Sequence, residues 1–189
     1  MVRTAVHQMA AWRAAGVPAI PVAVNLSARQ FLQGDVATLV EGLLMEADIA
    51  PHLLEIELTE SLSMADPERS LAIMHRLRKL GVTLSIDDFG TGYSSFSYLK
   101  RLPIDKLKID KSFVHDMVHS SDARAIVQAI VAMAHRMQLR VVAEGVETKE
   151  QAMALRETGC DQAQGYYYAR PLDAFEAGAY LAPISMQAD

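Results

Sequence analysis

The chain has 189 residues, of which 51% are hydrophobic, and it carries a formal net charge of −5. This length and apolar content suit one sizeable core, so we expect residues 1–189 to form a single domain. The acidic balance argues against binding of duplex nucleic acid or anionic lipid by charge alone, although bound cations reverse the field around clustered carboxylates.

Apolar residues recur at helical spacing over Val2 to Ala15, which predicts an amphipathic helix at the start of the chain. Arg3, His7 and Arg13 interrupt this segment, so we do not expect it to be a signal peptide. No apolar run approaches the roughly 20 residues that span a bilayer, so we expect no membrane segment.

After this helix, short apolar runs alternate with helical patterns. The predicted strands are Pro21 to Val24, Leu53 to Leu58, Val82 to Ile86, Leu107 to Ile109, Arg140 to Ala143 and Gln162 to Gly165. The predicted helices that follow them are Pro67 to Leu80, Ser95 to Arg101, Asp122 to Met137, Lys149 to Thr158 and Asp173 to Leu181.

This alternation is typical of α/β proteins with a parallel sheet, either open and doubly wound or closed into a barrel. Polar residues at nearly every strand end favour the barrel, where all the C-terminal ends meet at one mouth. A closed barrel has eight strands and typically about 250 residues. We therefore expect an incomplete TIM-like (β/α) barrel with about six of the eight strands, its open edge left by loss of the first portion or covered by another chain.

Carboxylates gather on two of the predicted strands. The two-residue period of a strand puts Glu55 and Glu57 on one face, and Asp87 and Asp88 end the next strand as neighbours. Ionised carboxylates inside a sheet are costly unless they are paired or bind a cation. One acidic residue after a strand is usually a helix cap or a solvated loop residue, but repetition at equivalent positions favours a site.

Oxygen donors follow several strands, and these hard ligands suit Mg²⁺ or Mn²⁺. The predicted metal ligands are Asn25, Glu57, Asp87, Asp88 and Glu144. Two ions about 3.5 to 4 Å apart would form the clamp used for phosphodiester hydrolysis.

Other polar segments allow more than one interpretation. Lys108 could form an ion pair with Asp110, or its ammonium could hold a water or a phosphate oxygen near the metals. The loop from Phe89 to Ser95 could be a phosphate nest, a lid or a tight connection, and Tyr166 to Tyr168 could stack on a base or pack at a strand end.

Cys160 is the single cysteine, which excludes an internal disulfide and favours a reducing, cytoplasmic setting.

Six motifs, in order along the chain, resemble those of the bacterial EAL-domain cyclic di-GMP phosphodiesterases. They are Asn25-Leu26-Ser27-Ala28-Arg29-Gln30-Phe31, Glu57-Leu58-Thr59-Glu60, Asp87-Asp88-Phe89-Gly90-Thr91-Gly92, Lys106-Leu107-Lys108-Ile109-Asp110, Ala143-Glu144-Gly145-Val146-Glu147-Thr148 and Gln164-Gly165-Tyr166. The resemblance implies a barrel with one antiparallel strand and cleavage of cyclic di-GMP to linear pGpG with two Mg²⁺ or Mn²⁺ ions.

The resemblance also implies roles for single residues. Asn25, Glu57 and Asp87 would hold one ion, and Asp87 would bridge to a second ion held by Asp88 and Glu144.

Four further positions that match the motifs would act around these ligands. Lys108 would position the attacking water, and Gln164 would bond within the metal and water shell. Glu60 would anchor the loop from Asp88 to Ser95, which in the family takes part in dimer contacts, and Glu147 would support the region of Glu144.

The Glu-Ala-Leu strand that names the family, and the antiparallel strand before it, have no counterpart in this sequence. The missing glutamate would be a metal ligand, and the family's arginine after it contacts substrate phosphate. We therefore expect a truncated domain from a longer protein, with upstream sensor or cyclase domains. Three hypotheses follow: an active phosphodiesterase, an inactive module that binds cyclic di-GMP, and a dimerisation module whose exposed strand edges pair between chains.

Overall fold

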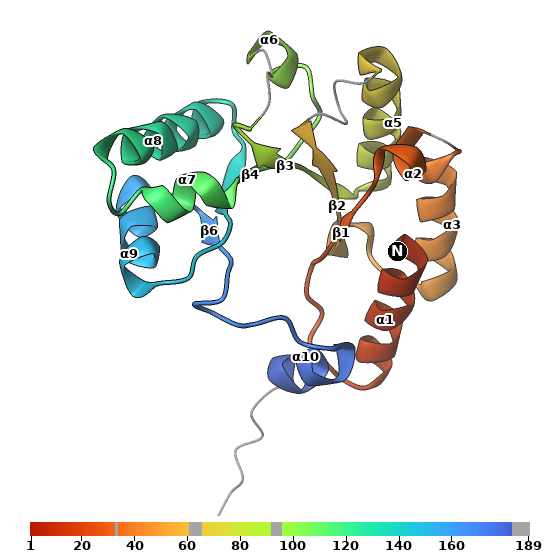
Figure 1. Cartoon of the computed structure of the whole chain (residues 1–189). Helices are drawn as coiled ribbons and strands as arrows, with labels where there is room; N and C mark the ends of the chain where they lie inside the picture. The colour runs from red at the N-terminus through yellow and green to blue at the C-terminus, as the bar shows by residue number, and fades with distance from the viewer. Residues whose placement is uncertain (33, 61–65, 92–95, 183–189) are drawn as a thin grey trace, which may run out of the picture.

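The strands form one parallel sheet that curves into a half-barrel (Figure 1). A computed structural model of the chain describes residues 1–32, 34–60, 66–91 and 96–182. Neighbouring strands pair in chain order from β1 to β6. Their bounds are β1 (Val22–Asn25), β2 (Leu54–Thr59), β3 (Thr83–Phe89), β4 (Lys106–Ile109), β5 (Arg140–Ala143) and β6 (Gln162–Ala163).

Helices surround the convex side of the arc of strands (Figure 1). Their bounds are α1 (Val2–Ala14), α2 (Ala28–Leu32), α3 (Val36–Ala47), α5 (Pro67–Leu80), α6 (Phe96–Leu99), α7 (Lys111–Asp116), α8 (Ser121–Arg136), α9 (Lys149–Thr158) and α10 (Ala174–Leu181), with a 3₁₀ turn η1 (Pro51–Leu53). Within the described ranges, no helix is long and apolar enough to cross a membrane.

Local signals explain where the longer helices begin and end. Asp66 accepts a hydrogen bond from the backbone N–H of Arg69 at the start of α5, and Gly81 ends that helix in the left-handed conformation with φ 91°. Thr148 and Gln151 form a reciprocal capping box at the start of α9. These signals place both helices at their predicted bounds.

The two faces of the sheet differ in chemistry. On β2, Ile56 and Leu58 are fully buried in the core beneath the helices. The alternate residues Glu55 and Glu57 are also buried, and they form ion pairs with lysines of β4. The concave face of the half-barrel is therefore lined by paired charges, whereas the convex face forms the apolar core.

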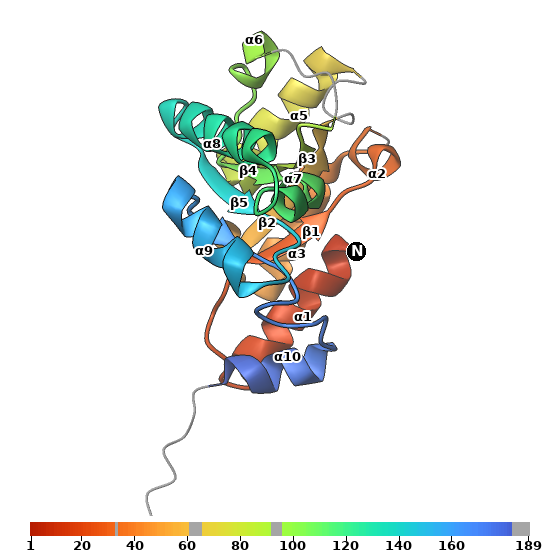
Figure 2. The same cartoon turned by 60° about the vertical axis from the view of Figure 1, so that its left-hand side comes forward.

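Helix α10 packs against α1 at the open side of the arc, as Figures 1 and 2 both show. The indole N–H of Trp12 donates to the carbonyl of Ala174 at 3.0 Å. A Cβ added at Gly178 would lie 2.9 Å from the indole nitrogen, so a side chain there would force the two helices apart. The C-terminal helix thus closes back onto the first helix of the chain.

Three helices do not appear among the predicted elements. Helix α3 was not predicted, although its sequence signal is clear. Asp35 caps the helix, and its apolar residues face the core at helical spacing. Helices α2 and α7 span only five and six residues, too short for periodicity to reveal. Strand β3 extends through Phe89, so Asp87 and Asp88 lie within the strand.

Candidate active site

Polar side chains from neighbouring strands meet at the C-terminal edge of the sheet. Asn25 is the last residue of β1, Glu57 and Asp87 lie in β2 and β3, and Lys108 lies in β4. Glu144 directly follows β5. Because parallel strands end at the same edge, residues far apart in sequence come within hydrogen-bonding distance here.

Lys108 is at the centre of this group. Its Nζ lies 2.7 Å from Glu57 Oε1, 3.1 Å from Asp87 Oδ1 and 2.6 Å from Glu144 Oε1. Only 4% of the lysine side chain is exposed. One buried ammonium is therefore shared by three carboxylates, which we call the carboxylate cluster (Glu57, Asp87 and Glu144).

Burial and pairing shift the protonation of these groups in opposite directions. Burial raises the pKa of Glu57 and of Glu144, and the hydrogen bonds from Lys108 offset only part of that effect. Burial alone would lower the pKa of Lys108, but its bonds to Glu144 and Glu57 prevail and raise that pKa. Lys108 is therefore a persistent cation in this site.

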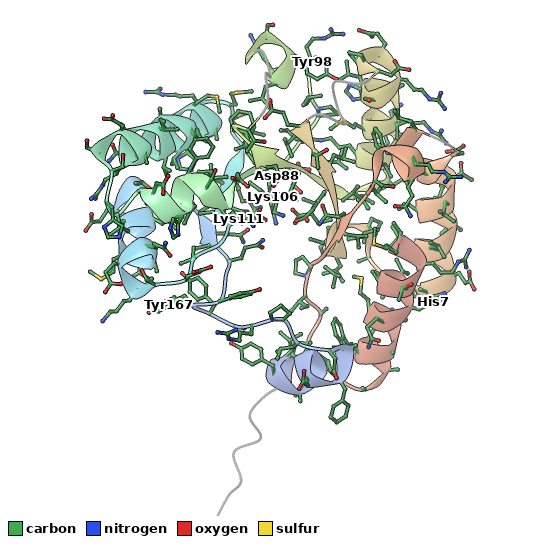
Figure 3. All side chains as sticks on the ribbon, in the orientation of Figure 1. His7, Asp88, Tyr98, Lys106, Lys111 and Tyr167 are labelled. Atoms are coloured by element: carbon green, nitrogen blue, oxygen red, sulfur yellow. The ribbon has the colours of Figure 1, made fainter. Side chains whose placement is uncertain are left out.

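A second grouping of oxygen atoms overlaps the carboxylate cluster. Carboxylate oxygens of Asp87, Asp88 and Glu144 lie within 4.8 Å of one another, a spacing that suits a shared cation. Burial raises the pKa of Asp88, and the neighbouring charge of Asp87 raises it further. Figure 3 shows Asp88 on the concave side of the arc.

Two amide side chains orient the carboxylates. Asn25 Nδ2 donates to Glu57 Oε2 at 2.8 Å, and Gln164 Nε2 donates to Glu144 Oε1 at 2.6 Å. The bond from Asn25 uses its amide nitrogen, so its carbonyl oxygen is the atom that could ligate a metal. Gln164 follows β6, which brings the last strand into the site.

The other two predicted site residues, Glu60 and Glu147, differ from each other in burial. Glu60 is buried, and its Oε2 accepts a hydrogen bond from the backbone N–H of Gly90 at 3.2 Å. This contact ties the end of β2 to the start of the predicted loop, whose residues 92–95 lie outside the described part of the chain. Glu147 is exposed and lines a pocket with Glu144.

That pocket, of about 450 Å³, lies beside the carboxylate cluster and is also lined by Lys111, Gln164 and Arg170. A larger pocket, of about 670 Å³, is elsewhere, at the N-terminal ends of β4 and β5. It takes in Asp105 and Arg140 and lies at the opposite edge of the sheet from the cluster.

One interpretation of a single residue is wrong. Lys108 does not pair with Asp110, because Asp110 caps α7 by accepting from the backbone N–H of Ser112.

The tyrosines at 166–168 follow β6, and each is 43% exposed or more. Arg170 lies over the ring of Tyr166, 5.3 Å from its centroid.

One buried ion pair, between Lys106 and Glu55, was not predicted from the sequence. Their nitrogen and oxygen atoms are 2.6 Å apart, one layer below the carboxylate cluster. The signal was present, because the two lysines of β4 and the two glutamates of β2 share the same two-residue period.

Comparison with known proteins identifies the family of the chain. A sequence model of the EAL domain matches residues 1–171. MucR of Pseudomonas aeruginosa, a bifunctional diguanylate cyclase/cyclic di-GMP phosphodiesterase, is 45% identical over 178 residues, which are 94% of this chain and 26% of MucR. The chain therefore spans about a quarter of the length of that relative.

Solved structures share the fold. The PaMucR phosphodiesterase in complex with c-di-GMP has a TM-score of 0.88 and 44% identity, over 93% of this chain and 71% of that one. The EAL domain of Mycobacterium smegmatis DcpA gives 0.91 and 38%, over 95% and 81%. A manganese and cyclic di-GMP complex of Klebsiella pneumoniae BlrP1 gives 0.81 and 31%, over 90% and 44%. Agreement in both sequence and fold over most of its length shows that the chain belongs to the EAL domain family.

Proposed function

We propose that this chain is a phosphodiesterase domain that hydrolyses one phosphodiester bond of cyclic di-GMP and gives linear pGpG. The observation that carries the proposal is the buried Lys108 ammonium among three carboxylates, at the strand edge where (β/α) barrels place their active sites. The activity named for MucR and the cyclic di-GMP bound in the PaMucR structure support the choice of substrate.

The donor set fits divalent cations. Every candidate ligand offers a hard oxygen atom, and three of the carboxylates lie close enough to share an ion. The residues that would hold two Mg²⁺ or Mn²⁺ ions are Asn25, Glu57, Asp87, Asp88 and Glu144. Bound there, such ions lower the pKa of a water nucleophile and stabilise charge on the attacking and leaving oxygens.

The protein's own groups would place the reactants. Lys108, held as an ammonium beside the carboxylate cluster, would position the attacking water. Gln164 would hold the Glu144 carboxylate in its orientation through the bond already formed. Glu60 would fix the backbone at Gly90, next to the aspartates of β3, and Glu147 would support the Glu144 region from the adjoining pocket.

We also propose a setting for this activity. The domain would comprise residues 1–189 and would act as a homodimer in the cytoplasm. Sensor or cyclase domains would accompany it in the parent protein, which fits the cyclase activity named for MucR. The thiol of Cys160, without a second cysteine in the chain, fits a reducing compartment.

Turnover by the purified chain tests the proposal. Cyclic di-GMP is incubated with the protein and Mn²⁺ or Mg²⁺, and pGpG is followed by liquid chromatography. We expect Asp87→Asn and Glu144→Gln to lower the rate by about 100-fold or more, because each removes a charged ligand. Glu46→Gln removes an exposed carboxylate of α3 and should match the wild type.

Three results would contradict the proposal. Full activity in Asp87→Asn would refute the site. Binding of cyclic di-GMP by calorimetry without any pGpG would make the chain a binding module. Neither binding nor turnover, with a dimer in light scattering, would favour the dimerisation module instead.

A further inference from the structure

We propose that the ion pair between Glu55 and Lys106 is a positioning element that keeps the ammonium of Lys108 at the carboxylate cluster. Its consequence for turnover rests on the proposed function, whereas its consequence for the lysine side chain does not. The pair lies on the concave face of the half-barrel, where Figure 3 labels Lys106.

The pair is short and almost fully enclosed. Lys106 Nζ lies 2.6 Å from Glu55 Oε2, and 14% and 7% of the two side chains are exposed. Two charges removed from water to this extent are tolerated only when each satisfies the other. The two buried charges therefore neutralise each other, one residue layer below the carboxylate cluster.

The pair repeats the arrangement above it. Glu55 precedes Glu57 by two residues on β2, and Lys106 precedes Lys108 by two residues on β4. Each glutamate thus has a lysine from β4, which lies two strands away from β2 in the sheet. Residues on one face of a strand recur about every 6.6 Å, which is close to the length of an extended lysine side chain.

Because of this repetition, Glu55 and the carboxylate cluster would both attract the Lys108 ammonium if Lys106 did not pair with Glu55. Glu55 interacts electrostatically with Glu57 and therefore belongs to the same charged interior. Without Lys106, Glu55 would be a buried carboxylate that has lost its ion-pair partner, and Lys108 is the next lysine along the same face of β4. Lys108 would be drawn down the strand, away from Glu144 and from the place of the attacking water.

Two variants test this competition, with an exposed lysine as the control. In Lys106→Met, we expect kcat to fall about 10-fold or more with KM unchanged, a loss typical of residues that support a metal site from behind its ligands. In Lys106→Met/Glu55→Gln the competing charge is also removed, so we expect most of the activity to return. Lys79→Met makes the same change on the outer face of α5 and should behave as the wild type.

A second measurement needs neither metal nor substrate. In protein labelled with ¹⁵N at lysine side chains, the Lys108 ammonium signal is assigned by its loss in Lys108→Met. We expect this signal to move in Lys106→Met and to return towards its wild-type position in the double variant. A pair that only stabilises the fold would lower the melting temperature and leave the signal unmoved.

If Lys106→Met does not fold, Glu55→Gln gives the same test, because it frees Lys106 to compete for Glu57. An unmoved Lys108 signal in the folded single variant, or no recovery in the double variant, would overturn the positioning role. Absence of turnover in the wild type would refute the proposed function, and the ammonium signal would still decide the role of the pair.

Discussion

Replacing Lys108 by methionine removes the ammonium around which the carboxylate cluster is built. The change keeps an unbranched side chain that is one heavy atom shorter, and it deletes the charge that lies within 3.1 Å of three carboxylates. Removing one partner of a buried ion pair costs about 3 to 5 kcal/mol. Because 17% of Glu144 is exposed, water reaches part of the cluster, and we take the lower end, about 3 kcal/mol.

Urea unfolding without divalent metal measures this cost. With a slope of about 2 kcal/mol per M, the midpoint should fall by about 1.5 M. Added Mn²⁺ should raise the midpoint of Lys108→Met more than that of the wild type, because the ion would replace the missing positive charge. Lys79→Met is the matched control.

Acid should reduce the loss of stability that Lys108→Met causes. Burial raises the pKa of Glu57 and Glu144, and loss of the Lys108 hydrogen bonds would raise both pKa values further. A carboxyl group whose pKa is higher in the folded state stabilises the fold below its unfolded pKa, and that contribution is lost as pH rises through the folded pKa. The deficit should therefore be smallest below about pH 4.5 and grow towards pH 7. A midpoint equal to that of the wild type, or a deficit independent of pH, would refute the reasoning.

Two further predictions concern residues around the last strands. Burial alone would raise the pKa of Asp161, but hydrogen bonds from His135 and from the backbone N–H of Val141 prevail and lower it. The aspartate therefore stabilises the fold at neutral pH. This contribution is lost as pH falls through the lowered pKa. Asp161→Ala should cost about 1 to 2 kcal/mol at pH 7 in urea unfolding, and equal midpoints at pH 7 would contradict this. Gly165 has φ 154°, and a Cβ there would lie 2.2 Å from the carbonyl oxygen of Val146. Gly165→Ala should therefore lower both the unfolding midpoint and turnover, and wild-type values of both would show that the backbone adapts.

Much of the fold follows from local signals in the sequence. Strand β5 and helices α5 and α9 have their predicted bounds, since each combines the right periodicity with caps or breakers at its ends. The short helices α2 and α7 span too few residues for periodicity to reveal them, although Asp110 caps α7.

The candidate site divides in the same way. The sequence by itself determined the chemistry of the strand ends, because acidic and amide side chains recur after apolar runs and their motifs identify the family. It left open whether Lys108 bonds to Asp110 or faces the metal ligands. The tertiary structure decided this, because parallel strands with staggered registers bring Glu57, Asp87 and Glu144 around one lysine, while helix capping occupies Asp110. Local sequence fixes which face a side chain takes, but only packing of the strands fixes which charges share that face.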